Sequence, residues 1–211
     1  MRICFIGDSF VHGTGDDECL GWAGRLSSAA RKSGCDLTCY NLGVRRDTSA
    51  DIALRWRAEA QARLPEGHDG RLVFSFGAND CTPTDTTGAV RVAHAQALEN
   101  AAAILGAANG WRSTLFVGPL PVCDDPITDE RIARLSEDLT IVCAGVGVPY
   151  LPVFSLALTS EVWRREAAAG DGTHPNTRGY TWLSELVSAW SAWQECIRGN
   201  ETIACKKSAH L

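Results

Sequence analysis

Short apolar runs alternate along the chain with longer segments in which apolar residues recur at helical spacing. The runs are rich in strand-favouring residues and cover residues 2–6, 37–41, 71–76, 113–117 and 149–153. Helix-like segments lie between or after them, at residues 20–31, 48–64, 87–109 and 128–144, with a last helix beginning after Asn176. This alternation predicts a mostly parallel sheet with helices on both faces. We expect one domain over residues 1–195 and a polar tail over residues 196–211.

Small and polar residues follow each of the first four strands. These segments are Gly7-Asp8-Ser9, Gly43-Val44-Arg45-Arg46-Asp47, Gly77-Ala78-Asn79-Asp80 and Gly118-Pro119-Leu120-Pro121. Because the carboxyl ends of parallel strands lie at one edge of a sheet, the four segments should converge on a single crevice. Such convergence of polar groups favours a ligand or catalytic site over four unrelated turns.

Composition excludes several classes of protein. The 45% apolar and 21% charged fractions are ordinary for a soluble globular domain. The net charge of −5 comes with only three lysines and no basic stripe, so we expect no nucleic-acid partner. No window approaches the roughly 20 continuous apolar residues that a bilayer span needs. No signal-peptide pattern follows Met1-Arg2, so we expect a cytoplasmic protein.

The nine cysteines do not form a metal-binding or disulfide pattern. Their number is odd, and they are scattered through strands, helices and loops. Cys35 and Cys39 are four residues apart, but no second pair and no histidine pair with zinc-like spacing accompanies them. In a reducing compartment such cysteines act as small buried hydrophobes or free thiols. We therefore expect neither a metal nor an organic cofactor.

A candidate catalytic group comes after the fifth strand, in Asp171-Gly172-Thr173-His174-Pro175-Asn176. An aspartate three residues before a histidine can accept the imidazole Nδ1 proton and leave Nε2 free as a base. A serine hydroxyl is inert without such a base. If Nε2 reaches Ser9, which follows the first strand, the two ends of the chain form a Ser-His-Asp triad in the order Ser, Asp, His.

A serine nucleophile also needs donors for the oxyanion that it creates. The side-chain NH₂ of Asn79, the backbone N–H of Gly43 and the N–H of Ser9 itself are the candidates. Each segment also has an ordinary interpretation: Ser9 and Asp8 as a helix cap, Asn79 as part of an Asx turn, Gly43 as a turn glycine. If every ordinary interpretation held, unrelated turns would have placed a nucleophile, a base, an orienter and donors at one sheet edge by coincidence. We therefore favour the catalytic interpretation. Asp8 itself more simply fixes its loop by accepting backbone amides.

Three of the strand-end segments, together with the segment that contains His174, resemble in order the four sequence blocks of the GDSL or SGNH hydrolases, a family of lipases and esterases. The matching residues are Gly7-Asp8-Ser9-Phe10, Gly43 in Asn41-Leu42-Gly43-Val44, Gly77-Ala78-Asn79-Asp80 and Asp171-Gly172-Thr173-His174-Pro175-Asn176, and they cover nearly the whole chain. The resemblance implies a flavodoxin-like three-layer α/β/α sandwich whose five-stranded parallel sheet has the order 2-1-3-4-5. It also implies that Ser9 is the nucleophile, His174 the base and Asp171 its orienter, with Gly43 and Asn79 as oxyanion donors beside the Ser9 amide.

Two departures from the family pattern bear on substrate. Phe10 replaces a leucine, an exchange of apolar groups that should leave the chemistry intact. Arg45 and Arg46 stand where relatives often carry small residues. A guanidinium in the cleft would hold an anionic acyl or head group. The alternative is a pair of solvated arginines bound to Asp47 or Asp51.

The sequence thus predicts a serine esterase that cleaves a small-molecule carboxylic ester, or a thioester, through an acyl-enzyme. Thioesterase, lysophospholipase and carbohydrate O-deacetylase activities are alternatives within the enzymes. Outside the enzymes, the alternative is a flavodoxin-like module that binds a small ligand such as a phosphate or flavin. The chain lacks a glycine-rich phosphate-binding run such as G-x-x-x-x-G-K-[ST], which argues against that module. Neither the natural acyl group nor the oligomeric state follows from the sequence.

Overall fold

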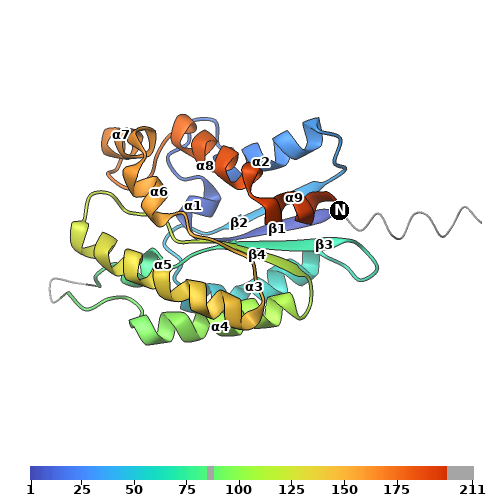
Figure 1. Ribbon diagram of the computed structural model, residues 1–211, viewed down its shortest axis with the longest axis horizontal. Coiled ribbons are helices and arrows are strands. Elements are labelled where there is room, and N and C mark those ends of the chain that lie inside the picture. The colour runs from blue at the N-terminus through green and yellow to red at the C-terminus, as the bar shows by residue number, and fades with distance from the viewer. Residues whose placement is uncertain (85–87, 199–211) are drawn as a thin grey trace, which may run out of the picture.

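A five-stranded parallel sheet forms the centre of the protein (Figure 1). The computed structural model describes residues 1–84 and 88–198. The strands are β1 (Arg2–Gly7), β2 (Thr38–Gly43), β3 (Gly70–Ser75), β4 (Ser113–Val117) and β5 (Tyr150–Leu151). They lie in the order β2-β1-β3-β4-β5, and every pairing is parallel. The predicted sheet and its strand order are confirmed.

Helices cover both faces of the sheet and complete three layers (Figure 1). One face carries α3 (Ser49–Arg63), α4 (His94–Asn109) and α5 (Pro126–Val146). The other face carries α2 (Gly21–Lys32), α8 (Thr177–Ala189) and α9 (Ser191–Arg198), with α7 (Glu161–Ala169) beside α8. Shorter helices are α1 (Ser9–His12), the 3₁₀ helix η1 (Asn79–Cys81) and α6 (Phe154–Thr159).

The apolar pattern of β1 explains why this strand lies inside the sheet. Its residues from Ile3 to Ile6 are fully buried, which requires cover on both faces. Phe5 meets Trp22 of α2 edge-on, with ring centroids 5.5 Å apart. In β3, Phe74 packs on the opposite face against Trp56 of α3. Aromatic contacts on both faces therefore hold the helical layers to β1, which precedes Ser9, and to its neighbour β3.

Two predicted helices differ from the observed ones. The segment predicted as a helix from residue 87 becomes helical only at His94, because a bridge between Pro83 and Val90 occupies the chain before it. The predicted last helix is two helices, since Trp190 adopts extended backbone angles between α8 and α9. Helix α9 runs to Arg198 and buries Cys196, so the predicted tail boundary falls inside a helix. The remainder of that tail, residues 199–211, lies outside the described residues.

Helices α6 and α7 were not among the predicted elements. They are only six and nine residues long, too short for a clear helical period. Ser160 caps α7, and the helix buries Trp163 completely. These two helices carry the chain from β5 back over the sheet, and they deliver it to the loop that contains His174.

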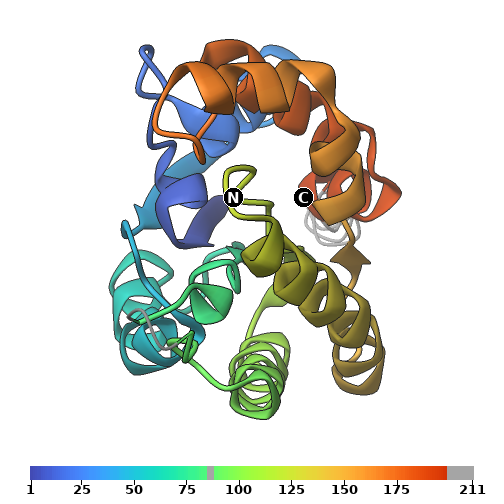
Figure 2. The same cartoon turned by 90° about the vertical axis from the view of Figure 1, so that its left-hand side faces the viewer.

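The carboxyl ends of the strands are level with one another. Gly7 at the end of β1 pairs with Gly43 of β2 and with Ser75 of β3. Figure 2 looks onto this edge, where α1 and the loop before α8 lie next to each other. Across residues 1–84 and 88–198, no helix combines the length and the hydrophobicity that crossing a membrane requires.

Candidate active site

Ser9 sits at a sharp turn from strand to helix. It is the first residue of α1, directly after the Asp8 that caps this helix by accepting the Phe10 amide at 2.9 Å. The strand before it ends at Gly7, where a Cβ would lie 1.9 Å from the carbonyl oxygen of Ser75. Only glycine permits this close approach of β1 and β3. The predicted role of Asp8, fixing the loop through a backbone amide, agrees with the structure.

His174 comes from the loop between α7 and α8 and reaches Ser9 across 165 positions of sequence. Its Nε2 lies 2.8 Å from Ser9 Oγ, and its Nδ1 lies 2.8 Å from Asp171 Oδ2. The second oxygen of Asp171 accepts the amides of Thr173 and His174, at 3.1 and 2.9 Å. The imidazole also packs against the Phe10 ring at 5.0 Å between centroids. The structure thus brings together the three side chains predicted as nucleophile, base and orienter.

Burial and hydrogen bonding act in opposite directions on this pair. Burial lowers the pKa of His174 below its ordinary 6.5, Asp171 opposes that effect, and the charge of Arg45 adds to the lowering. Burial would raise the pKa of Asp171, but the hydrogen bonds from the His174 amide and ring outweigh it and hold this pKa at about 2. At neutral pH the site therefore holds a neutral imidazole beside an ionised carboxylate, the state that a general base requires.

A family comparison covers most of the chain. The sequence profile of the GDSL-like lipase/acylhydrolase family matches residues 5–182. The chain belongs to this family. It is accordingly an ester-hydrolysing enzyme. A search of curated proteins finds no match.

Solved structures of similar fold include a lipase/acylhydrolase and an acetylxylan esterase. A lipase/acylhydrolase from Enterococcus faecalis is 22% identical, with 89% of this chain and 93% of that chain covered and a TM-score of 0.72. TesA is 23% identical over 93% and 99% of the two chains, with a TM-score of 0.70. Axe2, an acetylxylan esterase from Geobacillus stearothermophilus, is 14% identical over 93% of each chain, with a TM-score of 0.72. At these identities the likeness establishes the fold alone.

Asn79 lies at the start of η1, directly after the Gly77-Ala78 turn that ends β3. Its side-chain nitrogen donates one hydrogen to the Asp47 carbonyl at 2.9 Å. This bond fixes the amide group against the loop after β2. A side-chain NH₂ carries two hydrogens, so one remains for an oxyanion.

The Gly43 amide has a partner in the structure. It donates to Asn41 Oδ1 at 3.0 Å, a bond that an oxyanion would have to replace, and its role as an oxyanion donor stays a prediction. A Cβ at this position would lie 2.1 Å from the backbone nitrogen of His12. Asn41 also donates to the Val11 carbonyl at 2.8 Å. Glycine is needed here because α1 passes directly against the end of β2.

The turn that follows Gly43 contains strained backbone. Asp47 donates its amide to the Val44 carbonyl at 3.2 Å, and Arg46 between them has a φ of +73°. This left-handed conformation favours glycine and is costly for arginine. The amides of Arg45 and Arg46 have no hydrogen-bond partner among residues 1–84 and 88–198. Such strain clusters at ligand-binding and catalytic sites.

Arg55, which the sequence gave no reason to select, holds this turn to the sheet. Its Nε donates to Asp47 Oδ2 at 2.6 Å, and its Nη2 donates to the Gly7 carbonyl at 2.8 Å. Its Nη1 donates to the Leu42 carbonyl at 3.0 Å. One guanidinium therefore ties the ends of β1 and β2 to the carboxylate beside the Asn79 contact. An arginine inside a helix carries no motif that would have indicated this role.

The two arginines of the turn lie in different surroundings. Arg45 Nη2 lies 3.3 Å from Asp171 Oδ2, and the side chain remains 60% exposed. It borders two surface cavities of about 460 and 580 Å³ on either side of the 14–15 backbone. Arg46 contributes its carbonyl, which accepts Arg91 Nη1 at 2.7 Å. Arg45 therefore faces the cleft beside His174.

No group of three or more metal-ligating side chains forms in the part of the chain that the structure describes. Buried carboxyls do gather behind Ser9. Burial, together with the negative charges of Asp80 and Asp47, raises the pKa of Asp8 to about 7. Burial likewise raises the pKa of Asp80 to about 6, although its Oδ1 accepts the Ser49 amide at 2.7 Å.

Replacing the buried Asp8 by asparagine should change how stability depends on pH. Asp8→Asn keeps an oxygen for the Phe10 amide but removes the proton that the folded state retains between about pH 4 and pH 7. In the wild type, the stabilisation that comes from protonating Asp8 in the folded state is complete below the ordinary pKa of 3.8 and is lost as the pH rises towards about 7. Relative to wild type, the variant's free energy of unfolding should increase between about pH 5 and pH 8, by on the order of 1 kcal/mol or more.

Urea denaturation at both pH values measures this difference. Asp36→Asn, at a fully exposed aspartate, is the control and should show no such trend. An equal difference between Asp8→Asn and wild type at both pH values would contradict a raised pKa for Asp8.

Proposed function

We propose that the chain is a serine esterase with Ser9 as nucleophile, His174 as general base and Asp171 as orienter of the base. The observation that carries the proposal is the continuous pair of contacts from Ser9 Oγ to Nε2 and from Nδ1 to Asp171, each 2.8 Å long. Nδ1 donates to the carboxylate, so Nε2 is left without a proton and can accept one from the hydroxyl.

The reaction then follows from these positions. Ser9 Oγ attacks the ester carbonyl as its proton passes to His174 Nε2. The imidazolium, stabilised by ionised Asp171, gives that proton to the departing alkoxide and leaves an acyl group on Ser9. Water attacks the acyl-enzyme while His174 takes a proton from the water. His174 then returns this proton to Ser9 Oγ as the carboxylic acid leaves.

Amide groups are the donors that we assign to the oxyanion. Beside the Ser9 amide, we assign the second hydrogen of the Asn79 amide group. In the strained turn after Gly43, the amides of Arg45 and Arg46, which have no partner among residues 1–84 and 88–198, are further candidates. The Asn79 contact with Asp47 fixes these two sets of donors relative to each other.

The substrate that fits best is a carboxylic ester with a short acyl group or a polar alcohol. The cavity that His174 lines is otherwise bordered by Ala169, by glycines and by polar residues such as Thr14 and Glu166, without leucine, isoleucine, valine or phenylalanine. A fatty chain requires an apolar lining. The similarity in fold to an acetylxylan esterase agrees with an O-deacetylase activity on a polar substrate. A series of esters of increasing acyl length, tested with the Ser9→Ala protein as blank, separates this activity from long-chain lipase or thioesterase activity.

Removal of the nucleophile should abolish turnover. We expect Ser9→Ala and His174→Ala each to lower kcat by roughly 10⁴–10⁶, as in other serine hydrolases, with the fold retained. Hydrolysis of a chromogenic acetyl ester and circular dichroism provide the two measurements. Ser33→Ala, at a serine beyond the end of α2, is the matched control and should keep full activity. Wild-type rates in the Ser9→Ala protein would end the proposal.

Asn79→Ala should lower kcat by about 10²–10³ and leave KM nearly unchanged. An oxyanion donor acts mainly in the transition state, where the carbonyl oxygen carries negative charge. Steady-state kinetics on the same ester give both constants. If kcat does not fall, Asn79 does not belong to the oxyanion hole.

Arg45→Ala should move the acidic limb of the pH profile of kcat/KM to higher pH. Only neutral His174 acts as a base, and the Arg45 charge lowers the pKa of His174, so removing the charge raises this pKa. If Arg45 also holds an anionic group of the substrate, kcat/KM should fall more on an anionic ester than on its neutral analogue. Lys32→Ala, an equal loss of charge on the exposed end of α2, is the control. If the acidic limb of the pH profile does not move and the ratio of kcat/KM on the two esters does not change, Arg45 has neither role.

A further inference from the structure

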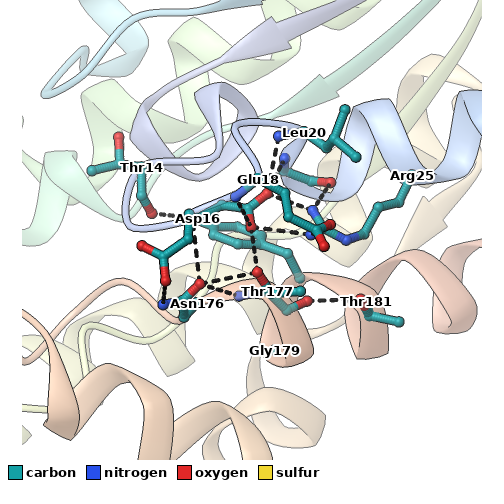
Figure 3. A network of polar contacts seen from close by, with 12 residues as sticks. Thr14, Asp16, Glu18, Leu20, Arg25, Asn176, Thr177, Gly179 and Thr181 are labelled. Atoms are coloured by element: carbon teal, nitrogen blue, oxygen red, sulfur yellow. Dashed lines mark hydrogen bonds and ion pairs between the residues drawn. The ribbon is translucent and has the colours of Figure 1, made fainter.

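The loop between α1 and α2, residues 13–20, is bound to the start of α8 by a network of polar contacts that includes none of the three candidate catalytic side chains (Figure 3). Its centre is Asp16, whose side chain is completely buried. Both carboxylate oxygens are paired with Arg25, and Oδ2 accepts the amides of Leu20 and Gly21 at 3.0 and 2.8 Å. Burial opposes ionisation of Asp16, but Arg25 and these amides hold its pKa well below its usual range.

The same carboxylate extends the network to the far end of the chain. Thr177 Oγ1, on the first turn of α8, donates to Asp16 Oδ1 at 2.9 Å. Asn176, which caps α8, accepts the Asp17 amide at 3.1 Å and donates to the Asp17 carboxylate at 2.7 Å. Tyr180 donates its hydroxyl to the Thr14 carbonyl at 2.7 Å. The loop that follows the Ser9 helix therefore binds the helix that follows His174.

Gly15 brings this loop into direct contact with the histidine. Its φ is +89°, and a Cβ placed on it would lie 2.8 Å from the Pro175 carbonyl oxygen and 3.1 Å from His174 Cβ. The Gly15 backbone therefore forms a wall behind His174, with no space for a side chain between them. This backbone lies against the Cβ from which the imidazole extends towards Ser9.

We propose that Gly15 and Asp16 are positioning residues that set the distance between His174 Nε2 and Ser9 Oγ. Ser9 is fixed by β1, whereas His174 stands on a loop that is not part of the sheet. The ion pair and the Thr177 bond clamp the two segments together, and the Gly15 wall stops the imidazole at hydrogen-bond distance. The inference rests on the proposed function, because the distance matters only if these groups react. A misplacement of about 1 Å can reduce the rate by 10²-fold.

The first experiment compares two glycine variants with the same backbone strain. Gly15→Ala and Gly34→Ala both place alanine at a positive φ, but a Cβ at Gly34 meets nothing within 4 Å. The shared backbone strain should lower the Tm of both variants, and the overlap with the Pro175 carbonyl should add to the loss in Gly15→Ala. At a temperature where both are folded, Gly15→Ala should lower kcat at least tenfold with KM within about twofold, and it should slow labelling of Ser9 by a fluorophosphonate. Gly34→Ala should retain wild-type kinetics and labelling.

The second experiment tests the clamp with a smaller change. Thr177→Val removes the hydroxyl that binds Asp16 but keeps the shape of the side chain. Thr181→Val, one turn later in α8, removes a hydroxyl that binds only the Thr177 carbonyl, and it is the matched control. We expect Thr177→Val to lower kcat and the labelling rate severalfold, Thr177→Ser to restore both, and Thr181→Val to leave them unchanged.

The outcomes separate the two proposals. If the wild type neither hydrolyses esters nor reacts with the fluorophosphonate, the proposed function fails. If the wild type is active and Gly15→Ala behaves like Gly34→Ala, or Thr177→Val behaves like Thr181→Val, the positioning role is refuted while the esterase stands.

Discussion

The site depends on one hydrogen bond, between Ser9 Oγ and His174 Nε2, which joins the two ends of the chain. Parallel strands make it possible, because every strand ends at the same edge and leaves its following loop there. Strand β1 delivers the hydroxyl at this edge. Helices α6 and α7 lead from β5 to the loop that carries the imidazole. The packing around the edge then has to hold two segments that share no strand pairing.

The carboxyl groups near this bond differ in whether a guanidinium or an imidazole donates to them. Asp171 and Asp16 are ionised because amide groups and an imidazole or a guanidinium donate to them, in spite of the cost of burial. Asp8 and Asp80 lie deeper and meet backbone amides without a guanidinium in contact, so burial raises the pKa of each. Asp171 is thus ionised at neutral pH, while Asp8 and Asp80 are easier to protonate.

Close backbone approach is the second constraint on the site. Gly7, Gly15 and Gly43 each stand where a Cβ would overlap another backbone atom or press on His174. Arg46 is the opposite case, a side chain in the left-handed region. Its strain is maintained by the turn, which Arg55 fixes to β1 and β2. The three glycines therefore let neighbouring segments of backbone approach closely, and the positive φ of Arg46 fixes the direction of its amide.

The sequence by itself determined the sheet and its carboxyl-edge segments, because strand period and local spacing are encoded in neighbouring residues, and with the family resemblance it selected Ser9, Asp171 and His174 as candidates. It also selected Asn79. Only the tertiary structure decided that the Gly43 amide is taken by Asn41, that Arg45 faces the cleft, and that Arg55 and the Asp16 network hold the site together. These facts depend on contacts between residues far apart in the chain, and no local pattern records which partner a buried donor will find.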